Sequence, residues 1–152
     1  MLITEIVHTS LVYHGGRRMF RRFNPPRGTH PSKIGIWFTE DRTLAERIAR
    51  QASRNIDDEP VLYACRLDLR NPVVFETYRD FLQTCGGDAA KARRRFMRQG
   101  FDGVEITHSD TDGGTVRRDF AVFSPDKVEI VEAVRLDPSA GIEQLGSLTS
   151  QN

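Results

Sequence analysis

The sequence predicts a single α+β domain, and three observations favour this fold class. With 152 residues, the chain is long enough to bury a hydrophobic core of its own. Helical segments separate the first short strands, whereas the later strands follow one another closely. The regular strand–helix alternation of a doubly wound sheet is absent, and no G-x-G-x-x-G follows a predicted strand. We expect residues 1–137 to form this domain and residues 138–152, which have little to bury, to form a mobile tail.

The N-terminal part of this domain predicts two strands joined by an irregular segment. The stretch LVYHGG (11–16) is typical of a short strand that ends in a glycine turn. Residues 17–33 are basic and interrupted by prolines, which predicts a loop. The apolar stretch IGIWFT (34–39) then predicts a buried strand.

A helix is predicted over residues 40–54, in the stretch EDRTLAERIARQASR. Either Asp41 or Thr39 can cap its N-terminus, because a short polar side chain can accept a bond from a free backbone N–H there. Apolar residues recur at helical spacing and predict its buried stripe, which would consist of Leu44, Ile48 and Ala52.

The middle of the chain predicts a strand followed by a helical region. In VLYACRLDL (61–69), apolar and polar residues alternate as in a strand with one buried face. That face would consist of Val61, Tyr63, Cys65 and Leu67. Proline cannot donate to a strand ladder, so Asn71–Pro72 is expected to end this strand. Residues 77–99 predict two helices that are separated at CGGD (85–88).

The C-terminal part predicts three strands that follow one another closely. The stretch GFDGVEI (100–106) indicates a turn that leads into a strand, and SDTDGGT (109–115) indicates a hairpin loop. Two further strands are predicted in DFAVF (119–123) and VEIVEAVRL (128–136), with the turn SPDK between them.

Composition and motif content exclude several functional classes. A net charge of +1, with 38% hydrophobic and 28% charged residues, provides no overall field for nucleic acid or a membrane surface. Cys65 and Cys85 are the only cysteines and have no partner at metal-ligand spacing, so we expect a reducing compartment and no metal. The sequence lacks H-E-x-x-H and G-x-S-x-G motifs. We see no signal peptide or transmembrane-length apolar run, and expect a cytoplasmic protein without membrane contact.

The order of five segments is the strongest functional signal in the chain. They are YHGG (13–16), GIWFTEDRTLAERIA (35–49), VLYACRLDLRNPVVF (61–75), GFDGVEI (100–106) and DFAVFSPDKVEIVEA (119–133). In this order they resemble the ADP-ribosyltransferase superfamily, in its diphtheria-toxin and poly(ADP-ribose)-polymerase-like branch, whose small members occur in bacteria and phages. The resemblance covers residues 11–134. It implies an ADP-ribosyltransferase-like split β-sandwich with flanking helices and an enzyme that uses NAD as a co-substrate.

The resemblance gives the first two segments a role in binding NAD. In this branch the motif histidine, here His14, bonds the adenosine ribose, and the backbone of the next residue, here Gly15, holds the nicotinamide carboxamide. Trp37 stands where the family has a tyrosine that stacks on nicotinamide, and Phe38 and Thr39 continue that cofactor-binding strand. From the residues alone, His14 could equally be a strand-end residue and Trp37 a core residue.

Two positions near these residues depart from the family pattern. Gly16 replaces a threonine, which removes one hydroxyl group. Ile48 stands where many members place a second tyrosine, and an isoleucine cannot stack on nicotinamide. The remaining histidines are predicted to lie on the surface or in loops, because a lone histidine is more often structural than catalytic; they are His8, His30 and His108.

Asp119 aligns with the catalytic glutamate of the family. A carboxylate there would stabilise the positive charge that develops on the ribose as nicotinamide leaves. His14 and Asp119 are therefore the expected catalytic residues. Asp119 could instead pair on the surface with Arg117 or Arg118, and Glu105 and Glu40 are the alternative carboxylates.

The loop 17–33 lies where the family holds the NAD pyrophosphate. Its arginines, with Arg17 and Arg22 as the expected ligands, could clamp phosphates bidentately, or the loop could be a solvated basic segment. The basic stretch KARRRFMR (91–98) is expected to be a helix face, with a target-docking or nucleic-acid patch as the alternative.

The function that the resemblance implies is transfer of one ADP-ribose unit from NAD to a macromolecular acceptor, by a toxin, an effector or a phage modifier. The acceptor is expected to be a protein, with nucleic acid as an alternative. An NAD glycohydrolase and a catalytically inactive NAD-fold binding protein are the other readings of the same residues.

Overall fold

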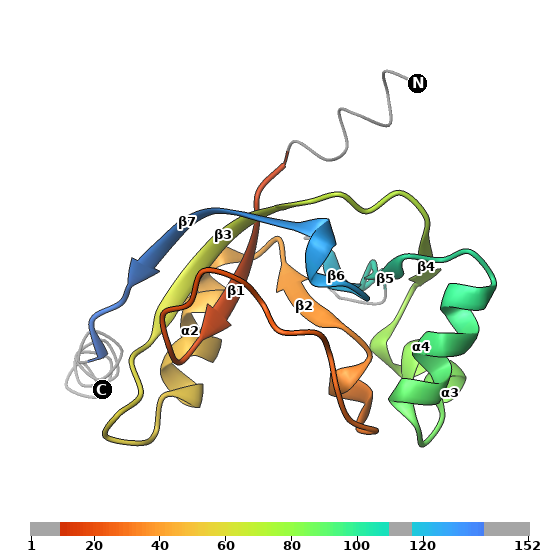
Figure 1. The fold of residues 1–152 in the computed structure, drawn as a ribbon, viewed down its shortest axis with the longest axis horizontal. Helices are drawn as coiled ribbons and strands as arrows, with labels where there is room; N and C mark the ends of the chain where they lie inside the picture. Colours follow the sequence, from red (N-terminus) through yellow and green to blue (C-terminus); the bar gives the residue numbers. More distant parts are fainter. Residues whose placement is uncertain (1–9, 110–116, 139–152) are drawn as a thin grey trace.

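The computed structural model describes residues 10–109 and 117–138, which build one mixed sheet with helices against it (Figure 1). The seven strands of this described part are β1 (Val12–Gly16), β2 (Ile36–Thr39), β3 (Val61–Leu67), β4 (Pro72–Phe75), β5 (Gly103–Ile106), β6 (Asp119–Val122) and β7 (Val128–Arg135). Its helices are α2 (Arg42–Ala52), α3 (Tyr78–Cys85) and α4 (Ala89–Arg98), with single 3₁₀ turns at η1 (Pro31–Lys33) and η2 (Pro125–Lys127). The mixed α and β content agrees with the predicted fold class.

The sheet has the strand order β4-β5-β6-β2-β1-β3-β7 and is weakly joined in the middle. All neighbouring strands are antiparallel except β4 and β5. β1 pairs with β3 over its whole length, and β2 pairs with β6 in the same way. By contrast, β1 and β2 share a single residue pair, Tyr13 with Thr39. Beyond this pair the two strands diverge, which separates the sheet into two halves (Figure 1).

Two hydrophobic cores pack against the sheet. Phe81, Phe96, Val104 and Ala121 belong to the core beneath α3 and α4. Val12, Phe23, Phe38 and Tyr63 belong to the second core, which includes the predicted inner face of β3. β2 contributes to both, because successive side chains of a strand point to opposite faces. Ile36 and Phe38 enter the second core, and Trp37 packs against the first.

Helix α2 packs against β1 with a different face from the predicted one. Asp41 caps the helix by accepting a bond from Leu44 N at 3.0 Å. Its buried residues are Ala45 and Ala49, whereas the predicted stripe of Leu44, Ile48 and Ala52 is partly or fully exposed. The reason is Gly15 on β1, where a Cβ atom would lie 2.1 Å from the carbonyl oxygen of Ala45. Such close approach of two backbones leaves room only for small side chains.

The other predicted elements are confirmed, with one strand missed. The two helices predicted over 77–99 are α3 and α4, which Thr77 and Asp88 cap. The missed strand is β4, which begins at Pro72 and runs parallel to β5. Proline is compatible with the first position of a strand, where its missing donor disturbs no ladder. The predicted hairpin loop at 109–115 and the tail after Pro138 lie almost wholly outside the described residues.

A candidate ligand-binding cleft where the sheet divides

A cavity of about 290 Å³ opens where β1 and β2 part. Its wall contains His14 and Gly15 from β1, Trp37 and Thr39 from β2, and Asp119 from β6. Helix α2 supplies an apolar side through Leu44, Ala45 and Ile48. Residues that are far apart in the sequence therefore meet at the point where the sheet divides.

His14 bridges the two diverging strands with its side chain. Its Nδ1 donates to the carbonyl oxygen of Trp37 at 2.7 Å, where backbone pairing between β1 and β2 has ended. Burial lowers the pKa of His14 below its usual value, and the bond to Trp37 opposes this effect only in part. The imidazole is therefore neutral near pH 7, and its Nε2 is left as a hydrogen-bond acceptor. Phe23 packs edge-on against the ring at 4.9 Å between centroids.

Three consecutive residues of β2 pack in the fold and also line the cavity. The indole nitrogen of Trp37 donates to Ser32 O at 2.9 Å, and the ring contacts Phe81 edge-on at 5.6 Å. Trp37 also lies on the cavity wall, so it is both a packed and a ligand-accessible residue. Phe38 and Thr39 are 2% and 5% exposed, and both contribute to the same wall. Tyr78 of α3 extends this wall beyond Trp37 at 6.4 Å between ring centroids.

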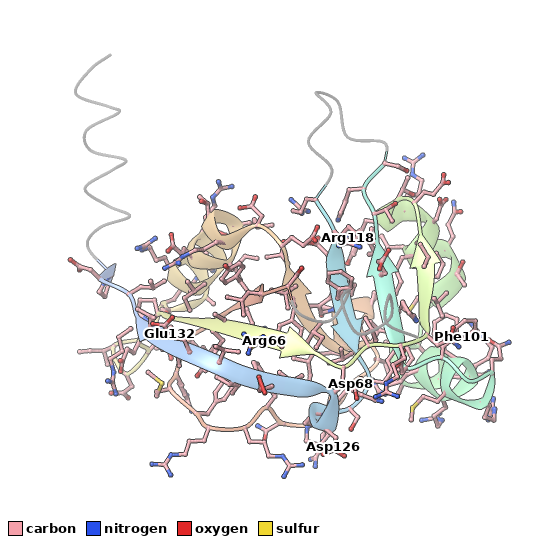
Figure 2. All side chains as sticks on the ribbon, turned by 90° about the horizontal axis from the view of Figure 1, so that it is seen from above. Arg66, Asp68, Phe101, Arg118, Asp126 and Glu132 are labelled. Atoms are coloured by element: carbon pink, nitrogen blue, oxygen red, sulfur yellow. The ribbon has the colours of Figure 1, made fainter. Side chains whose placement is uncertain are left out.

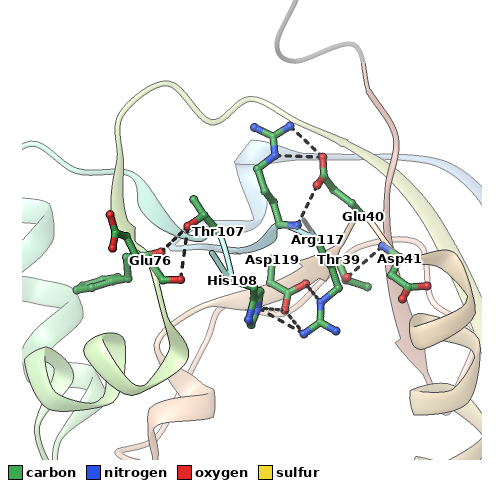
Figure 3. Close-up of polar contacts among 10 residues, drawn as sticks. Thr39, Glu40, Asp41, Glu76, Thr107, His108, Arg117 and Asp119 are labelled. Atoms are coloured by element: carbon green, nitrogen blue, oxygen red, sulfur yellow. Dashed lines mark hydrogen bonds and ion pairs between the residues drawn. The ribbon is translucent and has the colours of Figure 1, made fainter. Parts of the chain in front are cut away.

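Asp119 is held at the cavity by two side chains (Figure 3). Its Oδ2 accepts bonds from His108 Nε2 at 2.8 Å and from Arg117 Nη2 at 3.1 Å. Its Oδ1 accepts a third bond from Arg117 Nε at 3.2 Å. In the sheet, Asp119 pairs with Thr39 on one side and Ile106 on the other, so its backbone lies in the middle of the sheet. Asp119 therefore forms the predicted alternative pair with Arg117 and also lies at the cavity.

The two alternative carboxylates lie on the other side of the sheet from Asp119. Glu105 pairs with Phe120 in the register, and Phe120 follows Asp119 and so points to the opposite face. Glu40 accepts bonds from Arg118 N and Arg118 Nη2, each at 2.9 Å (Figure 2). This pairing raises the pKa of Arg118, and burial raises the pKa of Glu105. Neither Glu40 nor Glu105 is among the residues that line this cavity.

A second cavity of about 560 Å³ adjoins the first, because His14, Ser32 and Trp37 line both. Its wall is built mainly from the loop before β2 and includes Asn24, Pro25, Pro26, Arg27 and Lys33. Arg27 and Lys33 supply positive charge to this cavity.

The predicted phosphate ligands, Arg17 and Arg22, are not among the residues that line either cavity. Arg22 forms an ion pair with Asp126 at 2.9 Å, in which both side chains are 76% exposed. The loop turns its aromatic residues inward instead, since Phe20 stacks on Tyr63 at 4.4 Å between ring centroids. The hydroxyl group of Tyr63 also donates to the backbone oxygen of Arg18 at 2.6 Å, which holds the loop against the sheet.

Comparison with known protein families, curated proteins and solved structures finds no match for this chain. Within residues 10–109 and 117–138, no cluster of three or more potential metal ligands occurs. None of the helices in the same part of the chain is long and apolar enough to cross a membrane.

Proposed function

We propose that this chain is an NAD-dependent ADP-ribosyltransferase and that NAD binds where the two halves of the sheet part. One observation carries the proposal. His14, Trp37 and Asp119, which come from three separate segments of the family resemblance, line a single cavity. The weak junction between β1 and β2 supports the further proposal that the sheet corresponds to the split sandwich of that family.

The chemistry of the two cavities suits the parts of NAD. The nicotinamide half would occupy the apolar cavity, with its flat ring against Trp37 and its carboxamide on the backbone of Gly15. A cationic ring gains about 0.5–2 kcal/mol from contact with an aromatic face. His14 offers Nε2 as an acceptor for a ribose hydroxyl group. Arg27 and Lys33 of the adjoining cavity, in place of Arg17 and Arg22, would hold the pyrophosphate.

Asp119 would act on the bond between nicotinamide and ribose. As this bond breaks, nicotinamide leaves with the bonding electrons and the ribose carbon becomes cationic. The acceptor nucleophile then attacks that carbon and releases a proton. A carboxylate that accepts a bond from the nicotinamide-ribose hydroxyl stabilises the cation most strongly in the transition state, which lowers the barrier. Arg117 offsets part of the negative charge of Asp119, so we expect a modest turnover rate.

The proposal is tested by incubating the chain with NAD labelled in its adenylate half, with and without cell lysate. Transfer predicts a labelled macromolecule and free nicotinamide, whereas an NAD glycohydrolase would release free ADP-ribose. Asp119→Ala is expected to reduce turnover by about 10²–10³-fold while keeping most NAD affinity. Asp119→Glu restores the carboxylate of the family and should retain activity.

A matched control is Asp126→Ala, which removes an exposed carboxylate from η2, as labelled in Figure 2. It should leave turnover unchanged, because Asp126 lines neither cavity. If no macromolecule becomes labelled and the NAD stays intact, the proposed enzyme is contradicted. Parent-like turnover in a folded Asp119→Ala variant would instead remove Asp119 from the mechanism.

A further inference from the structure

The contacts of Asp119 leave little of its carboxylate free. Each carboxylate oxygen accepts about two hydrogen bonds. Oδ2 already accepts from His108 Nε2 and Arg117 Nη2, whereas Oδ1 accepts only from Arg117 Nε. One acceptor position on Oδ1 therefore remains for a ligand. The side chain of Asp119 is 17% exposed, and it lies at the cavity wall.

His108 contacts Asp119 from an unusual backbone conformation. Its φ of 53° is the only positive value for a residue other than glycine in residues 10–109 and 117–138. The left-handed region is uncommon for residues other than glycine, although histidine is among the types that adopt it most often. Both of its neighbours are held, because Thr107 N donates to Phe75 O at 2.9 Å and Ser109 N donates to Glu76 O at 3.0 Å. Figure 3 shows the ring of His108 beside the carboxylate of Asp119.

The proton on His108 follows from its partner. An ionised carboxylate only accepts hydrogen bonds, so His108 Nε2 must carry the hydrogen in the 2.8 Å contact. Arg117 Nη2 lies 3.4 Å from the same Nε2, and both of these nitrogens donate to Oδ2 of Asp119. Glu76, which precedes α3, is exposed, and its backbone oxygen accepts the bond from Ser109 N beside His108. Arg117 donates to both carboxylate oxygens and so fixes their plane, and His108 adds a second donor on Oδ2, which leaves the open acceptor position on Oδ1.

We propose that His108 is a positioning residue for the transfer reaction. By holding Oδ2 of Asp119, it directs Oδ1 towards the ribose hydroxyl of NAD. Arg117 alone cannot give this orientation the same rigidity, because its side chain is 36% exposed whereas that of His108 is 15% exposed. This inference rests on the proposed function.

A matched pair of substitutions separates the hydrogen bond from the space that the ring fills. His108→Gln keeps an amide N–H close to the position of Nε2, and His108→Leu has similar size without a donor. Neither residue is branched at Cβ, so both meet the left-handed backbone with similar strain. His108→Asn is the reserve variant, because asparagine, like histidine, is enriched in this region of backbone space, and we expect its shorter amide not to reach Oδ2.

Steady-state kinetics of NAD consumption provide the test, with circular dichroism melting curves to confirm folding. We expect His108→Leu to lower kcat by about 10- to 100-fold, the range for loss of a hydrogen bond to a charged group. The KM for NAD should change by less than about threefold, because the contact orients a group that acts in the transition state. His108→Gln should recover most of the parent kcat. If His108→Leu does not fold, His108→Asn should show the same loss of kcat.

The other outcomes distinguish failure of the positioning role from failure of the proposed function. A folded His108→Leu variant with the parent kcat would refute the positioning role while leaving the proposed function intact. Equal losses in His108→Leu and His108→Gln would mean that an N–H donor at this position does not restore turnover, which also overturns the inference. If the parent chain neither binds nor consumes NAD, the proposed function fails, and the role of His108 in that reaction fails with it.

Discussion

Replacement of Gly15 by alanine tests the packing that builds the cleft. A Cβ atom at Gly15 would lie 2.1 Å from Ala45 O and 2.7 Å from Ala49 N of helix α2. Ordinary contacts begin at 3.4 Å, so the helix must move by at least 1.3 Å, the difference between 3.4 and 2.1 Å. Backbone atoms cannot rotate away as a side chain would, and both alanines are fully buried.

Overpacking of this kind costs about 1–3 kcal/mol. In a chain of 152 residues this corresponds to a fall in Tm of about 2–12 °C. Urea denaturation and thermal melting measure the loss, with Gly87→Ala as the matched control. No atom lies within 4 Å of a Cβ at Gly87 and its φ is not positive, so that variant should match the parent within about 1 kcal/mol. Identical stability of Gly15→Ala and Gly87→Ala would refute the close contact between β1 and α2.

Three further predictions follow from burial and capping. Because burial lowers the pKa of His14 from 6.5, the unfolded chain binds its proton more readily, and the free energy of unfolding should fall as the pH drops below about 6.5. Urea titrations at several pH values should show this fall to be smaller in His14→Gln. Burial raises the pKa of Cys65 to about 12 and also raises that of Cys85, so neither thiol of the folded chain should react with Ellman's reagent at pH 7 until urea is added. Asp41→Ala removes the cap of α2 and should cost about 0.5–2 kcal/mol in chemical denaturation, whereas an unchanged midpoint would exclude the capping bond.

Local patterns predicted most of the secondary structure, because capping residues and periodic apolar residues act within a few positions of the chain. The α2 face was predicted incorrectly for a reason that lies outside the helix. Periodicity alone favours Leu44 and Ile48 as buried residues, yet Gly15 on another strand brings the helix so close that only Ala45 and Ala49 fit. Both larger residues line the cavity instead.

The candidate site was predicted in part. His14, Trp37 and Asp119 were identified from the family resemblance, and they line one cavity. His108 was missed because a single histidine before a glycine-containing loop resembles a surface residue. Its contact with Asp119 depends on the pairing of β5 with β6 and on a left-handed backbone angle, which the sequence does not reveal.

The positive groups of the second cavity also depend on tertiary structure. The density of arginines in RRMFRR (17–22) favoured Arg17 and Arg22. However, Phe20 within this segment and Phe23 directly after it turn inward and leave Arg22 in solvent. Arg27 and Lys33, from the later part of the same loop, line the second cavity. An alternating pattern of aromatic and basic residues was the available signal that part of this loop is packed.

The most direct test of the account is a titration with NAD that is followed by tryptophan fluorescence. Trp37 is the only tryptophan of the chain, and it lies on the walls of both cavities, so its emission responds to a ligand in the cleft. We predict a saturable decrease in emission that is half-complete at or below about 1 mM NAD, the upper end of ordinary substrate affinities. An emission spectrum that does not change in a saturable way over this range would contradict the claim that NAD binds where the sheet divides.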